Sequence, residues 1–70
     1  MSIEVFKTNV DEVSMARKLL ALLAIHFPGN KINFDMHDCD KILRVEGENL
    51  IASNIVSIVN AHGFMCVILD

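Results

Sequence analysis

The stretch KINFDMHDCDKILRVEG, residues 31–47, contains two alternating runs separated by HDCD. In the second run Leu43 and Val45 share one side of the chain, and every second side chain of the first run is apolar. The apolar members of the first run are Ile32, Phe34 and Met36, and the other side of the second run carries Ile42, Arg44 and Glu46. Strict alternation is typical of a strand with one buried face. Residues 31–47 therefore predict a β-hairpin with HDCD at its tip.

Helical patterns flank this hairpin on both sides. Upstream, apolar residues recur every three or four positions over residues 10–26, and Asn9 with Glu12 resembles a capping box. This helix is expected to stop before Pro28-Gly29. Downstream, Asn49 is expected to cap a second helix, and Gly63 stands where a left-handed residue ends a helix, with Phe64 as its apolar partner. The hairpin is therefore expected to lie between two helices.

Two further strands complete the pattern. Residues 2–7 alternate, with Ile3 and Val5 expected on the core side and Phe6 on the other, and residues 64–69 are almost wholly apolar. The order strand, helix, strand, strand, helix, strand predicts an α+β fold in one domain over residues 1–70, a ferredoxin-like βαββαβ sandwich with sheet order 4-1-3-2 and both helices on one face. The expected core comprises Val5, Leu20, Leu23, Ile32, Phe34, Leu43, Val45, Ile55 and Val59.

Composition narrows the function classes. The chain has 70 residues, is 53% hydrophobic and carries a net charge of −3. A nucleic-acid binder usually has a basic face, so this acidic chain is not expected to bind nucleic acid. The longest apolar run, residues 19–25, is too short to span a membrane, and two cysteines without an export signal indicate reduced thiols in the cytoplasm.

The whole chain resembles the heavy-metal-associated domain of copper chaperones and metal-pumping ATPases. The resemblance rests on the element order and on FPG at 27–29, NFDM at 33–36, RVEG at 44–47 and HGF at 62–64. It implies the same ferredoxin-like fold. That family binds a soft metal through a CxxC pair before the first helix, but its cysteine positions fall here on Val13 and Ala16, or on Glu12 and Met15. The chain therefore lacks the metal-binding motif of the family it resembles.

Other metal donors are expected near the hairpin tip. His37, Cys39 and His62 would lie at one end of this sheet, and thiol and imidazole groups suit zinc or copper. An ordinary hairpin tip explains His37 and Cys39 better, because Asp, His and Cys are common in turns and no spacing here is that of a known metal site. No bound cofactor is expected. Cys39 and Cys66 would be separated by two strand spacings, about 10 Å, so both thiols are expected to be free.

The leading functional hypothesis is a small non-catalytic interaction module, because no nucleophile–base pair or phosphate-binding loop is present. Its partner would be a protein or a second copy. The two candidate surfaces are the helix-free sheet face, with Phe6, Ile42 and Arg44, and a stripe on the first helix, with Met15, Leu19 and Leu22. The alternatives are a soft-metal carrier with atypical ligands at the hairpin end and a small-ligand sensor resembling ACT domains.

Overall fold

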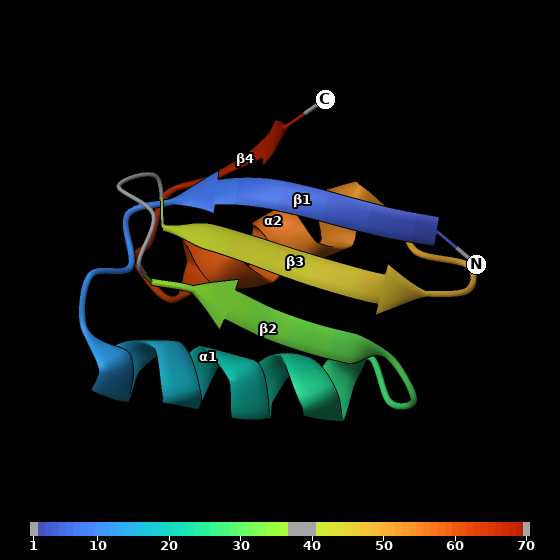
Figure 1. The fold of residues 1–70 in the computed structure, drawn as a ribbon, viewed down its shortest axis with the longest axis horizontal. Helices are drawn as coiled ribbons and strands as arrows, with labels where there is room; N and C mark the ends of the chain where they lie inside the picture. Colours follow the sequence, from blue (N-terminus) through green and yellow to red (C-terminus); the bar gives the residue numbers. More distant parts are fainter. Residues whose placement is uncertain (1, 37–40, 70) are drawn as a thin grey trace.

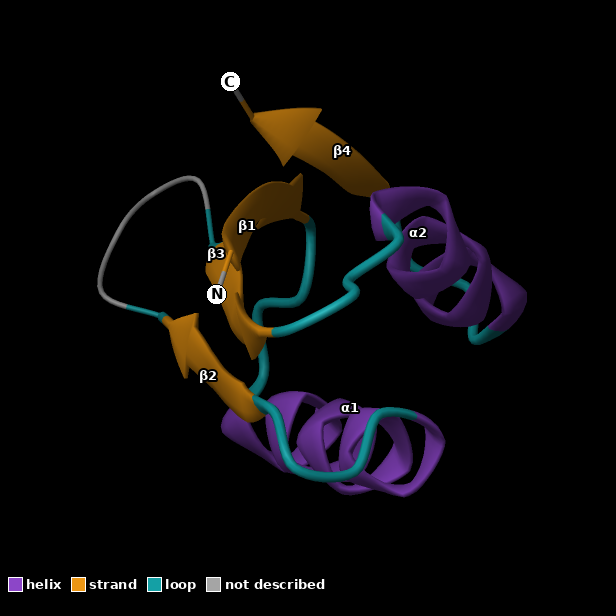
Figure 2. Cartoon of the chain, turned by 90° about the vertical axis from the view of Figure 1, so that its right-hand side faces the viewer, coloured by secondary structure: helices purple, strands orange, loops and turns teal. Residues whose placement is uncertain are grey.

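The computed structural model describes residues 2–36 and 41–69, and these form four strands and two helices. In chain order the elements are β1 (Ser2–Thr8), α1 (Val13–His26), β2 (Lys31–Asp35), β3 (Ile42–Gly47), α2 (Ala52–Ala61) and β4 (Cys66–Leu69). The four strands make one antiparallel sheet in the order β2-β3-β1-β4, which is the predicted order read from the opposite edge (Figure 1). Both helices lie on the same face, α1 beside β2 and α2 beside β4 (Figure 2). The predicted ferredoxin-like architecture is confirmed.

The core lies between the sheet and the two helices. Phe6 pairs with Leu43 and shares its face, so β1 directs Glu4, Phe6 and Thr8 toward the helices. The buried core cluster consists of Phe6, Leu23, Leu43, Val45, Ile55, Val59 and Cys66, and Ile32 and Phe34 pack against it. Most of the predicted core is therefore confirmed.

The prediction for β1 was wrong by one residue. Phe6, expected on the helix-free face, is fully buried among the core residues. Val5, expected in the core, lies on the helix-free face and is half-buried. The face of β1 is set by its pairing with β3, whose Leu43 and Val45 point inward, and the large Phe6 side chain buries more apolar area there than Val5 would. Leu20 was also assigned wrongly to the core and is half-buried.

The start of α1 also differs from the prediction. The helix begins at Val13 with Glu12 as N-cap, and no side chain caps it. Asn9 has another partner, because its side-chain Oδ1 accepts a hydrogen bond of 2.7 Å from the Met65 N–H, just before β4. Residues 9–12 therefore form a connection in which Asn9 ties the end of β1 to the start of β4.

The buried Thr8 stabilises the same connection through hydrogen bonds. It is 3% exposed, and its hydroxyl donates to the Lys41 carbonyl at 2.7 Å and accepts from the Val10 N–H at 3.3 Å. Its backbone N–H also donates to the Lys41 carbonyl, at 3.2 Å. Because Val10 is fully buried, Thr8 supplies an acceptor to an N–H group that water cannot reach.

The C-terminus of α2 was predicted correctly. Gly63 has φ +88°, its N–H donates to the Asn60 carbonyl at 2.9 Å, and the Phe64 N–H donates to the Val59 carbonyl at 3.3 Å. These two bonds are those of a Schellman motif, and Phe64 packs against the core as its apolar partner. The N-terminus was predicted wrongly, because Ile51 is the N-cap. Asn49 has φ +58°, a left-handed conformation that an N-cap does not adopt.

Candidate binding surfaces

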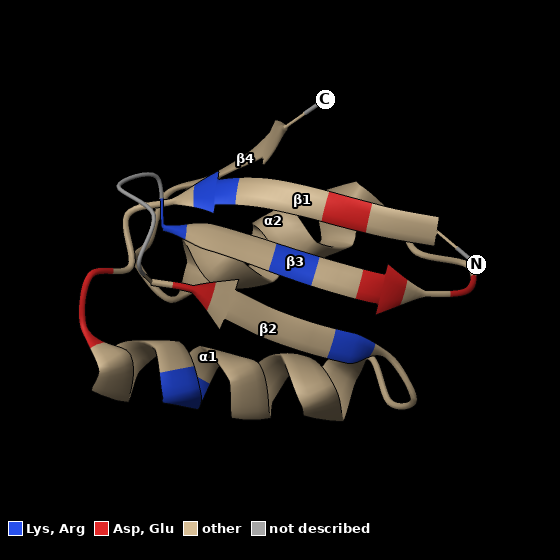
Figure 3. Ribbon diagram, in the orientation of Figure 1, with Lys and Arg blue, Asp and Glu red and all other residues tan. Residues whose placement is uncertain are grey.

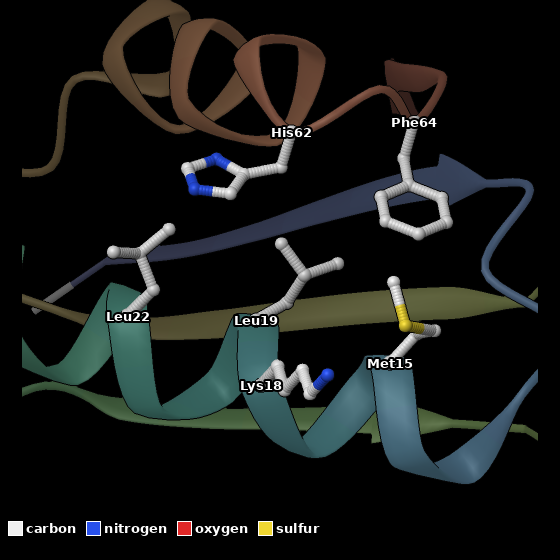
Figure 4. A pocket seen from close by; sticks show the side chains of 6 residues that line it. All are labelled: Met15, Lys18, Leu19, Leu22, His62 and Phe64. Carbon is white, nitrogen blue, oxygen red and sulfur yellow. The ribbon is translucent and has the colours of Figure 1, made fainter.

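A groove opens between the two helices, and we call it the inter-helix groove. Its volume is about 230 Å³, and it is lined by Met15, Lys18, Leu19, Leu22, His62 and Phe64. On α1, Met15 is three or four positions from Lys18 and Leu19, and Leu22 follows these two at four and three positions, so the four residues share one face of the helix. The opposite wall comes from the turn between α2 and β4 (Figure 4). Two wider depressions, of about 410 and 360 Å³, lie at the α1–β2 turn and beside the end of α1.

The floor of the inter-helix groove is made by buried, well-packed apolar side chains. Leu19 is buried in a second apolar cluster with Val10 and Ala16, and Met15 and Phe64 pack against that cluster. Met15, Leu22 and Phe64 remain half-buried, so each has apolar surface left in the groove. The predicted stripe of Met15, Leu19 and Leu22 thus does lie together, with Leu19 in the floor of the groove and Met15 and Leu22 in one wall.

The opposite wall depends on the turn that ends α2. Gly63 reverses the chain so that His62 and Phe64 both face α1, His62 toward Leu22 and Phe64 toward Met15 (Figure 4). The Nδ1 of His62 donates to the Ile58 carbonyl at 2.9 Å, which leaves Nε2 as an acceptor in the neutral ring. Lys18 contributes an ammonium group to the lining, and its side chain is exposed. The groove is therefore apolar, with an ammonium and an imidazole at its rim.

The sequence did not indicate Lys18, His62 or Phe64 as parts of this groove. Phe64 could be expected to pack near Val59 from the Gly63 signal, but its position opposite Met15 depends on how the helices cross the sheet. His62 was considered only as a metal ligand. A surface made by two distant segments leaves no local signal in either of them.

The helix-free face of the sheet is mostly apolar on one half only. The register pairs Val5 with Leu69 and Lys7 with Val67, and Ile3 lies on the same face of β1, whereas β3 and β2 carry mostly charged or polar side chains there. Of the residues predicted for this face, Arg44 is exposed there, and Ile42 is on this face but almost fully buried between Lys7 and Asp35 of the adjacent strands. Phe6 is absent from this face for the reason given above.

The predicted metal donors are divided between described and undescribed parts of the chain. His37 and Cys39 lie outside the described residues, and His62 lies in the inter-helix groove. Across residues 2–36 and 41–69, no group of three His, Cys, Asp or Glu side chains could hold a metal ion. Cys66 is a free, buried thiol, and desolvation by burial raises its pKa to about 11. A thiol in this state is a poor nucleophile and metal ligand at neutral pH, because the reactive form is the thiolate.

Comparison with known proteins gives no relative from which a role could be inferred. No family model matches the chain, and neither the curated proteins nor the solved structures contain a significant match. No helix in the described part of the chain is long and apolar enough to cross a membrane.

Proposed function

We propose that this chain is a small, non-catalytic, cytoplasmic interaction module that binds another protein through the inter-helix groove. The observation that carries the proposal is the groove itself, with a buried floor at Leu19 and half-buried apolar walls at Met15, Leu22 and Phe64. When a partner covers apolar side chains that line a concave surface, their removal from water stabilises the complex.

The size of the groove favours a side chain over a metabolite as its occupant. Small-molecule sites usually measure about 300–1,000 Å³, and this groove measures about 230 Å³. One large apolar side chain, such as Leu or Phe, suits that volume, and its burial would contribute roughly 1.5–3 kcal/mol. The Lys18 ammonium at the rim would favour an acidic residue next to that anchor. We therefore propose a protein segment with one apolar anchor and an acidic neighbour.

The resemblance to heavy-metal-associated domains supports a module of that type that acts without a soft metal. In one alignment the family's two thiol positions fall on Val13, which is exposed, and Ala16, which is buried beneath the groove. In the other alignment they fall on Glu12, which is exposed, and Met15, which is half-buried in the groove wall. In both alignments the second position carries an apolar side chain that packs in or beneath the groove, which supports a role based on apolar contact.

A peptide selection tests the proposal. Random displayed peptides would be selected against the protein, and binding would be remeasured with Leu22→Glu, which places a carboxylate in the groove wall. Ile25→Glu is the matched control, because Ile25 lies on the same helix, three residues later, and is 76% exposed outside the groove. We expect peptides with one apolar anchor, at least about tenfold weaker binding by Leu22→Glu, a loss of 1.4 kcal/mol or more, and no change with Ile25→Glu. Failure to select any peptide, or equal binding by Leu22→Glu, would refute the groove as the binding site.

A further inference from the structure

The two edges of the sheet are protected to very different degrees. β2 forms one edge, carries Lys31 and Asp35, and lies beside α1. β4 forms the other edge and has no charged residue and no proline within Cys66–Leu69 (Figure 3). Soluble proteins usually protect an edge strand with charges, proline or a covering element, because its unpaired N–H and C=O groups can pair with another strand. β4 is the unprotected edge.

The backbone groups that β4 leaves unpaired can be identified. Thr8 directs its N–H to Lys41, on the β3 side of β1, so the adjacent Lys7 directs its own groups to β4, where it pairs with Val67. The bond from the Met65 N–H to Asn9 agrees, because Met65 and Val67 direct their groups to the same side. Cys66 and Ile68 therefore direct their N–H and C=O groups to the free edge, and no hydrogen bond within the described residues uses them.

Side chains on both faces of β4 are apolar and accessible. Val67 is 48% exposed and Leu69 is 37% exposed on the helix-free face, and Ile68 is 44% exposed on the face that carries α2. Met65, just before the strand, is exposed as well. A strand that pairs with this edge would thus cover apolar surface on both faces as well as four backbone groups.

We propose that β4 pairs in antiparallel orientation with β4 of a second copy of this chain, with Val67 of the two copies facing each other at the two-fold axis. In this register Cys66 of each copy lies opposite Ile68 of the other, and Met65 lies opposite Leu69. The outward N–H and C=O groups of Cys66 and Ile68 then form four hydrogen bonds between the copies, the pattern of an antiparallel ladder. The two four-stranded sheets become one continuous eight-stranded sheet.

Charge and area favour this occupant in a reversible complex. Within residues 65–69, every side-chain pair opposed in this register is apolar, so no like charges meet there. The nearest charges on the helix-free face, the two Lys7 ammonium groups, start from strands three spacings apart, about 14 Å, which exceeds the ~8 Å Debye length at physiological salt. An interface made by one short strand lies at the small end of the size range, below about 1,200 Å² in total, where complexes dissociate readily. The proposal is independent of the inter-helix groove.

Hydrogen exchange and sedimentation test the proposal on the whole chain. As concentration rises, we expect a reversible monomer–dimer equilibrium, and exchange of the Cys66 and Ile68 amides should slow by about tenfold when the dimer predominates. The Val67 and Leu69 amides, which already pair with β1, serve as the internal control and should change less. A chain that stays monomeric at concentrations up to about 1 mM would leave this edge to a strand of another protein and refute the proposal.

Charge substitutions at the two-fold axis test the register. Val67→Lys and Val67→Glu each place like charges opposite each other, so each variant alone should be monomeric, whereas an equimolar mixture should associate again as a heterodimer. Ile25→Lys, at an exposed apolar site on α1, should dimerise like the wild type. Circular dichroism would confirm that each variant is folded. A dimer of Val67→Lys alone, or a mixture that stays monomeric while both variants are folded, would refute the register.

Discussion

The buried hydroxyl of Thr8 provides a sharp test of how the chain positions α1. Thr8→Val keeps the shape of the side chain but removes the donor to the Lys41 carbonyl and the acceptor for the Val10 N–H. The Lys41 carbonyl would keep its bond from the Thr8 N–H. The Val10 N–H would lose its acceptor in a fully buried position. The substitution therefore removes two hydrogen bonds, and one of the losses leaves the buried Val10 N–H unpaired.

The size of the effect follows from these two losses. The deleted bond to Lys41 contributes about 1 kcal/mol, and a buried, unpaired N–H costs about 1–3 kcal/mol. The free energy of unfolding should thus fall by about 2–4 kcal/mol, a large part of the ~5 kcal/mol expected for a small domain. Thr8→Ser is the control, because it keeps the hydroxyl and loses one methyl group, which is worth about 0.8 kcal/mol.

Urea denaturation followed by circular dichroism measures both variants. With an m value near 1 kcal/mol/M, the midpoint should fall by about 2 M or more for Thr8→Val and by about 1 M for Thr8→Ser. If Thr8→Val unfolded at the same urea concentration as Thr8→Ser, or at a higher one, the hydroxyl would have no structural role and the account of residues 8–10 would be wrong.

Three further substitutions or titrations have defined outcomes. Burial raises the pKa of Cys66 from 9.0 to about 11, so folding favours the protonated thiol, and this contribution to stability is complete below pH 9 and is lost between pH 9 and about 11. Over that interval the free energy of unfolding of the wild type should fall by up to about 3 kcal/mol more than that of Cys66→Ala. An equal dependence of the two free energies on pH would contradict this. Gly63→Ala should lower stability by about 1 kcal/mol, or several degrees in Tm, because Gly63 has φ +88° and an added Cβ would have open space around it, so the cost lies in the backbone conformation. Gly63→Asn should lower stability less. An unchanged Tm for Gly63→Ala would count against the left-handed conformation. Titration with zinc against a competing chelator should show no submicromolar one-to-one complex, because the chain lacks a thiol pair before α1; such a complex, abolished by Cys39→Ser or His37→Ala, would restore the metal-carrier hypothesis.

The elements that could be predicted from the sequence are those with a strong local signal. The alternation in residues 31–36 and the Gly63-Phe64 ending of α2 each depend on neighbouring residues alone, and both predictions are confirmed. The face of β1 could not be predicted in this way, because Ile3 and Val5 compete with the single larger Phe6. The start of α1 was misplaced because Asn9 bonds to Met65, which is 56 residues away in the sequence.

The candidate site was only partly predictable for the same reason. Helical spacing was enough to group Met15, Leu19 and Leu22 on one face of α1. It could not show that His62 and Phe64 would form the opposite wall, because that depends on the placement of both helices on the sheet. The β4 edge was predicted only as an apolar strand, since the direction of its free backbone groups follows from the pairing with β1.

The central position of β1 has a consequence for synthesis of the chain. β1 is made before both of its neighbours, residues 42–47 and residues 66–69, so one side of the strand has no partner until residues 66–69 have been made. A nascent chain therefore exposes Phe6 and an unpaired strand edge while the intervening elements are translated, and such surfaces promote aggregation and chaperone binding. Slow synthesis between residues 47 and 66 should prolong that exposure, so the yield of folded protein should depend on the speed of translation in this segment.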